Sequence, residues 1–109
     1  TYADSIAAGR VVEAPVTTQI ADGLAVRVAD ATALSVLMQH LDHVVQISDD
    51  EVAAAMKAIF EDTHNVAEGA GAAAFAAAMQ EREQLKGQVV GAVLSGGNVD
   101  AAVFSKVLA

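Results

Sequence analysis

The segment at residues 95–98 has a composition that could bind a ligand. It reads Ser95, Gly96, Gly97 and Asn98, and it follows the continuous apolar run VVGAVL at 89–94. In open α/β sheets, ligands bind beyond the carboxyl ends of the strands. Two glycines let the backbone approach a ligand closely, and the serine adds a hydroxyl beside free amide groups. The pattern fits either a binding loop or an ordinary strand-to-helix turn.

Two other segments could line a site, although each has a simpler structural explanation. Glu68 precedes the small residues GAGA at 69–72, which would let a ring or a neighbouring backbone come close. The same residues are explained by tight helix packing, with the carboxylate at the positive end of the helix dipole. In the segment TTQIADG at 17–23, Asp22 and Gly23 are typical of a turn.

The histidines and the acidic clusters carry little chemical signal. His40 and His43 are three residues apart, but neither they nor His64 are patterned with a further ligand, so no metal site is predicted. The acidic clusters at 49–51 and 81–83 are interpreted as solvated faces.

Capping signals and helical periodicity predict the elements that position these segments. Asp30 is a plausible N-cap, and Ser48 with Glu51 forms a capping box ahead of an amphipathic stretch. A run that is apolar all round, in the first half of 70–85, implies burial between other elements. The expected helices cover residues 1–9 with a stop at Gly9, 30–41, 48–63, 70–85 and the stretch from Asp100 onward.

Two short apolar runs predict strands, HVVQI at 43–47 and VVGAVL at 89–94. The second lacks alternation, which is typical of a strand covered on both faces in a parallel sheet. The predicted fold class is therefore α/β, a parallel-sheet fragment with covering helices. Because two strands do not make a stable doubly covered sheet, their neighbours are expected in a part of the polypeptide outside these residues.

The composition and charge of the chain exclude several classes of binding partner. The chain has 109 residues, 54% of them hydrophobic, and a net charge of −8 with six scattered basic residues. Without clustered Lys and Arg, neither nucleic acid nor an anionic membrane surface is an expected partner. The absence of cysteine excludes disulfides and thiolate metal sites. No apolar run approaches the roughly 20 residues of a spanning helix. A cytoplasmic protein is expected.

Taken in order, the motifs resemble the serine/threonine dehydratase branch of the fold-type II enzymes that depend on pyridoxal phosphate (PLP). The resemblance rests on TTQIADGLAV at 17–26, on DHVVQISDDEVAAAMKAIFEDTHNVAEGAGAAAFAA at 42–77 and on GQVVGAVLSGGNVD at 87–100. Threonine dehydratases, serine dehydratases and serine racemases share this set. The resemblance implies that the chain belongs to the large domain of such an enzyme.

The resemblance also implies roles for individual residues. Ser95 matches the serine whose hydroxyl hydrogen-bonds the pyridine nitrogen of PLP, and Glu68 would pack under or beside the ring without acting as the base. The family often has Glu-Pro where this chain has Glu68-Gly69. The residues implied to bind or adjoin the cofactor are Ser95, Gly96, Gly97, Asn98, Gly23, Glu68 and, close to the active site, Asp22.

The family's Schiff-base lysine and its glycine-rich phosphate loop match nothing in this sequence. Lys57, Lys86 and Lys106 do not lie in the context of that lysine. Residues 1–109 are therefore expected to be the C-terminal portion of the catalytic domain, with the upstream half absent. This segment is expected to contain no catalytic residue, and alone it should be inactive.

The expected activity of the intact protein is dehydration of serine, threonine or a related 3-hydroxy amino acid, which releases a 2-oxo acid and ammonia. The resemblance equally allows a serine racemase-like or other fold-type II activity. A free-standing interaction module without catalysis is a third reading. The expected partners are an amino acid substrate, the upstream half of the same domain and further copies in a homo-oligomer.

Overall fold

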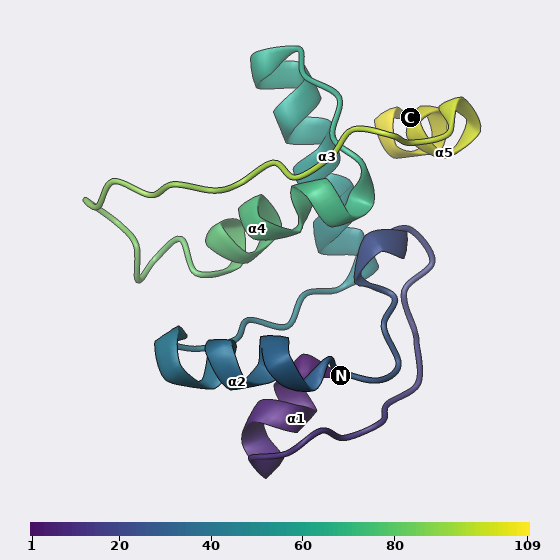
Figure 1. The fold of residues 1–109 in the computed structure, drawn as a ribbon. Helices are drawn as coiled ribbons and strands as arrows, with labels where there is room; N and C mark the ends of the chain where they lie inside the picture. The colour runs from purple at the N-terminus through teal and green to yellow at the C-terminus, as the bar shows by residue number, and fades with distance from the viewer. The chain divides into compact units, whose positions relative to one another are not determined.

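The computed structural model describes all residues from Thr1 to Ala109 and is helical (Figure 1). The chain divides into two compact units, residues 1–17 with 25–46, and residues 18–24 with 47–109. None of the helices is both long and apolar enough to cross a membrane. In chain order, the elements are α1 (Tyr2–Ala8), the short 3₁₀ helix η1 (Asp22–Leu24), α2 (Ala31–His40), α3 (Asp49–Thr63), α4 (Gly69–Gln80) and α5 (Ala101–Leu108).

The first unit is built from α1 and α2, whose ends follow the predicted signals. Helix α1 ends at Gly9, which adopts the left-handed conformation with φ 69°. Helix α2 starts at Asp30, whose carboxylate accepts a hydrogen bond from the amide of Ala33 at 2.8 Å. An isolated antiparallel bridge between Glu13 and Val28 joins the two flanking segments of this unit.

The second unit centres on α3 packed against α4. The capping box predicted at Ser48 and Glu51 is present, and α3 ends at His64. The core is small and rich in alanine because most residues of α4 are alanine or glycine. These small side chains let α3 and α4 approach closely. The buried residues are Val52, Ala55 and Met56 of α3, Ala67 before α4, and Ala72 and Ala76 of α4.

Helix α5 packs against α3. Phe104 of α5 meets Phe60 of α3 edge to face, with ring centroids 5.4 Å apart. Edge-to-face pairs bring the positive edge of one ring to the negative face of the other. This contact joins the last helix to the second unit.

The two predicted strands are absent from the structure. Residues 43–47 and 89–94 have no regular secondary structure, and no strand is assigned anywhere in the chain. A strand requires hydrogen-bonding neighbours, and residues 89–94 find none: Val89 is fully exposed and Val93 is 77% exposed. The parallel sheet is therefore not confirmed within residues 1–109.

The predicted helix at 70–85 is too long. Helix α4 ends at Gln80, and residues 81–87 form turns that finish at Gly87 with φ 80°. Apart from Leu85, the apolar residues of this stretch stop at Met79, and the sequence EREQ at 81–84 would give a longer α4 no apolar surface to bury. The predicted α5 is confirmed, although the Asp100 side chain makes no capping hydrogen bond.

Candidate functional site

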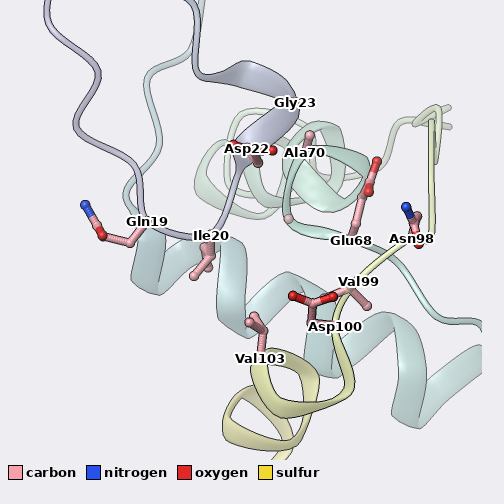
Figure 2. Close-up of a pocket in the computed structure, with 11 residues that line it drawn as sticks. Gln19, Ile20, Asp22, Gly23, Glu68, Ala70, Asn98, Val99, Asp100 and Val103 are labelled. Atoms are coloured by element: carbon pink, nitrogen blue, oxygen red, sulfur yellow. The ribbon is translucent and has the colours of Figure 1, made fainter.

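Three segments of the second unit meet around the N-terminus of α4 and form a pocket of about 490 Å³ (Figure 2). They are the loop with η1, the start of α4, and the chain that leads into α5. The backbone amide of Glu68 donates to the carbonyl of Gly96 at 3.0 Å. The lining residues are Gln19, Ile20, Asp22, Gly23, Glu68, Gly69, Ala70, Asn98, Val99, Asp100 and Val103.

Small residues allow the first of these segments to lie on α4. A β-carbon on Gly69 would overlap the backbone carbonyl of Ile20, and one on Gly23 would lie 2.9 Å from the β-carbon of Ala70. Both contacts are shorter than a β-carbon tolerates. A residue with a side chain at position 23 or 69 would therefore push the loop away from α4. The close packing that the sequence suggested for residues 69–72 is thus confirmed.

The Gly-Gly pair fits against α4 and the residues just before it for the same reason. A β-carbon on Gly71 would overlap the carbonyl oxygen of Gly96, and one on Gly96 would overlap the carboxylate of Glu68. On Gly97 it would lie 2.5 Å from the carbonyl oxygen of Val66. The backbone contacts favour glycine at 71 and 97, whereas a side chain at 96 would meet the flexible end of Glu68.

The structure brings most of the predicted site residues together. Gly23, Glu68 and Asn98 line the pocket and come from its three segments, as Figure 2 shows, and Asp22 lies on the same wall as Gly23. Gly96 and Gly97 are not among the lining residues: Gly96 lies against Glu68 and Gly71, and Gly97 lies against the Val66 carbonyl. Ser95 also lies outside the pocket, and it is exposed.

The pocket is acidic. Its lining includes the carboxylates of Asp22, Glu68 and Asp100, and it includes no Lys, Arg or His. Such a lining favours cations and N–H donors and disfavours a phosphate. The structure contains no group of three or more His, Cys, Asp or Glu side chains placed to hold a metal ion.

Two members of the acidic cluster at 49–51, Asp49 and Glu51, make hydrogen bonds within the second unit. Asp49 accepts hydrogen bonds from the Thr18 hydroxyl at 2.5 Å and from the Gln19 amide at 2.7 Å. Glu51 accepts from the Ser48 amide at 2.7 Å. That bond lowers the pKa of the Glu51 carboxyl below its usual value of 4.5, with a further contribution from the Gln80 amide group.

Asp49 is the functional candidate that sequence reasoning missed. Its partners lie about 30 positions earlier in the chain, a separation that no local pattern reports. The only available signal was Thr18, since Thr hydroxyls commonly accept from amides two or three residues on. Thr18 does so here with Ile20 at 3.3 Å and Ala21 at 3.0 Å.

The protein-family model described as pyridoxal-phosphate dependent enzyme matches residues 1–96. The chain belongs to this family. The resemblance to its serine/threonine dehydratase branch is confirmed, because the relatives that match include threonine ammonia-lyases, threonine dehydratases and serine racemases.

Two relatives illustrate the match to threonine enzymes. The L-threonine ammonia-lyase of Geobacter sulfurreducens is 38% identical over 105 residues, which are 95% of this chain and 26% of that protein. The solved structure of the processed form of threonine deaminase isoform 2 from Solanum lycopersicum superimposes with a TM-score of 0.87 at 29% identity, over 97% of this chain and 32% of that one.

A serine racemase is similar as well. The solved structure of maize serine racemase gives a TM-score of 0.81 at 31% identity, over 96% of this chain and 34% of that one. The 109-residue chain thus spans about a quarter to a third of the length of these relatives.

The pocket fits one end of PLP. Its volume lies in the range of small-molecule sites, roughly 300–1,000 Å³, and its lining includes the small residues Gly23, Gly69 and Ala70. The acidic lining suits hydrogen-bond donors and the amino group of a substrate, and it does not suit the phosphate. The lining offers a phosphate no Lys, Arg or His side chain.

Proposed function

We propose that the full-length protein containing this chain is a PLP-dependent ammonia-lyase that acts on a 3-hydroxy amino acid such as threonine or serine. The reaction would remove water across Cα–Cβ and release a 2-oxo acid and ammonia. The observation that carries the proposal is the meeting of the three dehydratase-like segments around one pocket, in a chain whose family is PLP-dependent. The names of the similar threonine ammonia-lyases and dehydratases support the same substrate class.

Within this site, we propose that Ser95, Gly96, Gly97 and Asn98 hold the ring end of the cofactor, with Gly23 and Glu68 flanking it. Bound PLP supplies an electron sink for bond cleavage at the substrate Cα. The Ser95 hydroxyl would hydrogen-bond the pyridine nitrogen and, unlike a carboxylate, would not hold a proton on that atom. The exposed Ser95 would have to turn towards the pocket when the ring binds.

We further propose that residues 43–47 and 89–94 are strands of a parallel sheet in the longer protein. The support is the exposed apolar surface of 89–94, where Val89, Val90, Val93 and Leu94 all face solvent in this chain. Neighbouring strands would bury this surface and pair its backbone groups. The dehydratase resemblance also leads us to expect a homo-oligomer, which analytical ultracentrifugation of the full-length protein would test. From the composition we expect a cytoplasmic protein.

The decisive experiment is spectroscopy and turnover on the purified full-length protein. We expect visible absorbance from bound PLP and release of a 2-oxo acid from L-threonine or L-serine. Ser95→Ala should lower kcat/KM at least about tenfold because the ring nitrogen loses its hydrogen-bond partner. Ser105→Ala, at an exposed serine of α5, is the matched control and should retain activity.

A protein without visible absorbance and without product would contradict the proposal and would favour an interaction module. Activity that is unchanged in Ser95→Ala would contradict only the role of Ser95.

Racemisation of serine is a second candidate function, supported by the similarity to maize serine racemase. Chiral chromatography separates the two reactions on the same sample. Formation of D-serine from L-serine with little 2-oxo acid would favour the racemase, whereas net loss of serine with ammonia release would favour the lyase.

A further inference from the structure

The first turn of α3 holds the loop that forms one wall of the pocket. Asp49 is the first residue of this helix, and its two carboxylate oxygens accept from different groups of the loop, one from the Thr18 hydroxyl and the other from the Gln19 amide. Hydrogen bonds to a charged acceptor are stronger than those between neutral groups. The two bonds therefore fix the start of the loop on α3.

Thr18 extends this network into the loop. While its hydroxyl donates to Asp49, the same oxygen accepts from the amides of Ile20 and Ala21. The loop then closes in η1, where the Leu24 amide donates to the Ala21 carbonyl at 2.9 Å. One carboxylate thus orders, directly or through Thr18, the amides at 19–21.

The far end of the loop is held by α4. Ala21 is buried, and the backbone at Ile20 and Ala21 lies against Gly69 so closely that a β-carbon there would overlap it. The loop is therefore held by polar contacts with α3 on one side and by close backbone packing on α4 on the other. Asp22 and Gly23, which line the pocket, follow directly after these contacts.

The other two acids of this turn provide a comparison. Asp50 is exposed, and no hydrogen bond joins it to the loop. Glu51 is engaged in the capping box and with Gln80 of α4. Of three consecutive carboxylates, Asp49 alone is bonded to the pocket wall.

We propose that Asp49 is a positioning residue that acts through Thr18 and Gln19 to hold Asp22 and Gly23 in the conformation that forms this wall of the site. The structural part of the proposal concerns the loop itself, and its consequence for turnover rests on the proposed lyase function.

The test compares variants of the full-length protein by amide hydrogen exchange, by the Kd for PLP and by steady-state kinetics. Asp49→Ala and Thr18→Val should accelerate exchange of the amides at 19–21 about tenfold, because each removes hydrogen bonds that involve a charged acceptor. Both should weaken PLP binding and lower kcat/KM by about the same factor. Helix content should remain unchanged in the folded protein.

Two conservative variants and one control sharpen the result. Thr18→Ser keeps the hydroxyl and should restore wild-type exchange, and Asp49→Asn keeps one acceptor and should be intermediate. The double variant Asp49→Ala with Thr18→Val should be no worse than the more affected single variant, since the two residues act through one network. Asp50→Ala removes an equal charge from the same helical turn and should behave as the wild type.

Equal acceleration in Asp49→Ala and Asp50→Ala, or none in either, would overturn the proposal. It would also be overturned if exchange accelerates while the Kd for PLP and kcat/KM stay at wild-type values. A wild-type protein that neither binds PLP nor turns over would instead contradict the proposed function, and the exchange measurements would still decide whether Asp49 holds the loop.

Discussion

Two stretches of the second unit are both apolar in sequence but have opposite environments. In the helical core formed by α3 and α4, Met56 is fully buried and Val52 is 2% exposed. In the extended segment, residues 89–94, Val93 is 77% exposed and Val89 is completely exposed. The helices satisfy their backbone hydrogen bonds internally and need only one apolar face to pack. The extended segment needs neighbouring strands, and the chain offers none.

This difference shows that apolar sequence alone does not secure burial. A helix can be complete within its own residues, so α3 and α4 form a core once their faces meet. A strand is completed only by partners elsewhere in the polypeptide. The Gly-Gly loop connects the two kinds of region. It follows the extended segment in the chain, and Gly96 packs on α4.

Truncation of a core side chain should have the largest effect. Met56→Ala removes a fully buried side chain and should lower the free energy of unfolding by about 2–5 kcal/mol. In the same 109-residue chain, Val93→Ala should change it by no more than about 0.5 kcal/mol because the side chain faces solvent. Urea unfolding followed by circular dichroism measures both, and similar losses would remove the distinction between the two regions.

The same Val93→Ala substitution tests the proposed sheet in the full-length protein. If neighbouring strands bury the segment there, the cost should rise towards the roughly 1.5–3 kcal/mol of a buried valine. A cost that stays near zero in the longer protein would contradict a strand at 89–94.

A pair of glycines gives the next largest contrast. Gly71→Ala places a β-carbon against the Gly96 carbonyl and should destabilise the protein by about 1–3 kcal/mol, although alanine is the better helix former. Gly91→Ala meets no atom within 4 Å and should be neutral or slightly stabilising. Thermal unfolding of the two variants provides the comparison, and equal behaviour would show that the loop does not lie on α4.

The C-terminal end of α3 tests a smaller, local contribution. His64 adopts a left-handed conformation with φ 60°, which is unfavourable for residues with a β-carbon. His64→Gly should therefore raise the free energy of unfolding by about 0.5–1 kcal/mol, despite loss of the ring contact with Phe60. Asn65→Gly, where φ is negative, should instead be destabilising. Chemical denaturation of both variants checks the sign.

The N-terminal end of α3 should show the smallest effect, and it depends on pH. The pKa of Glu51 is lowered from 4.5, first by the Ser48 amide and then by Gln80, so its ionised form stabilises the folded state above pH 4.5. This contribution is lost as the pH falls through the lowered pKa. Glu51→Gln should be less stable than the wild type at neutral pH, and the two should converge in acid.

Unfolding midpoints across this pH range measure the convergence. Gln80→Leu removes the second donor and should reduce the pH-dependent difference. A constant difference between wild type and Glu51→Gln at every pH would show that the hydrogen bonds of Glu51 do not depend on its charge.

Much of the local structure was predictable from the sequence. The start of α2 at Asp30, the capping box at Ser48 and the stop at Gly9 depend on groups within a few residues of one another. The motifs that meet at the pocket were also identified, because Gly and small residues mark places where backbones come close. The close packing at 69–72 was predicted, but the partners of these residues, Ile20 and Gly96, were not.

Three features were decided by tertiary structure alone. The role of Asp49 depends on Thr18, which lies 31 residues away, a separation at which no periodicity or capping rule applies. The exposure of Ser95 and the absence of strands at 43–47 and 89–94 depend on which neighbours are present. The sequence by itself determined the helices and, except at the C-terminal end of α4, their ends, because those interactions are local. The pocket and the state of the extended segment depend on contacts between distant parts of the chain.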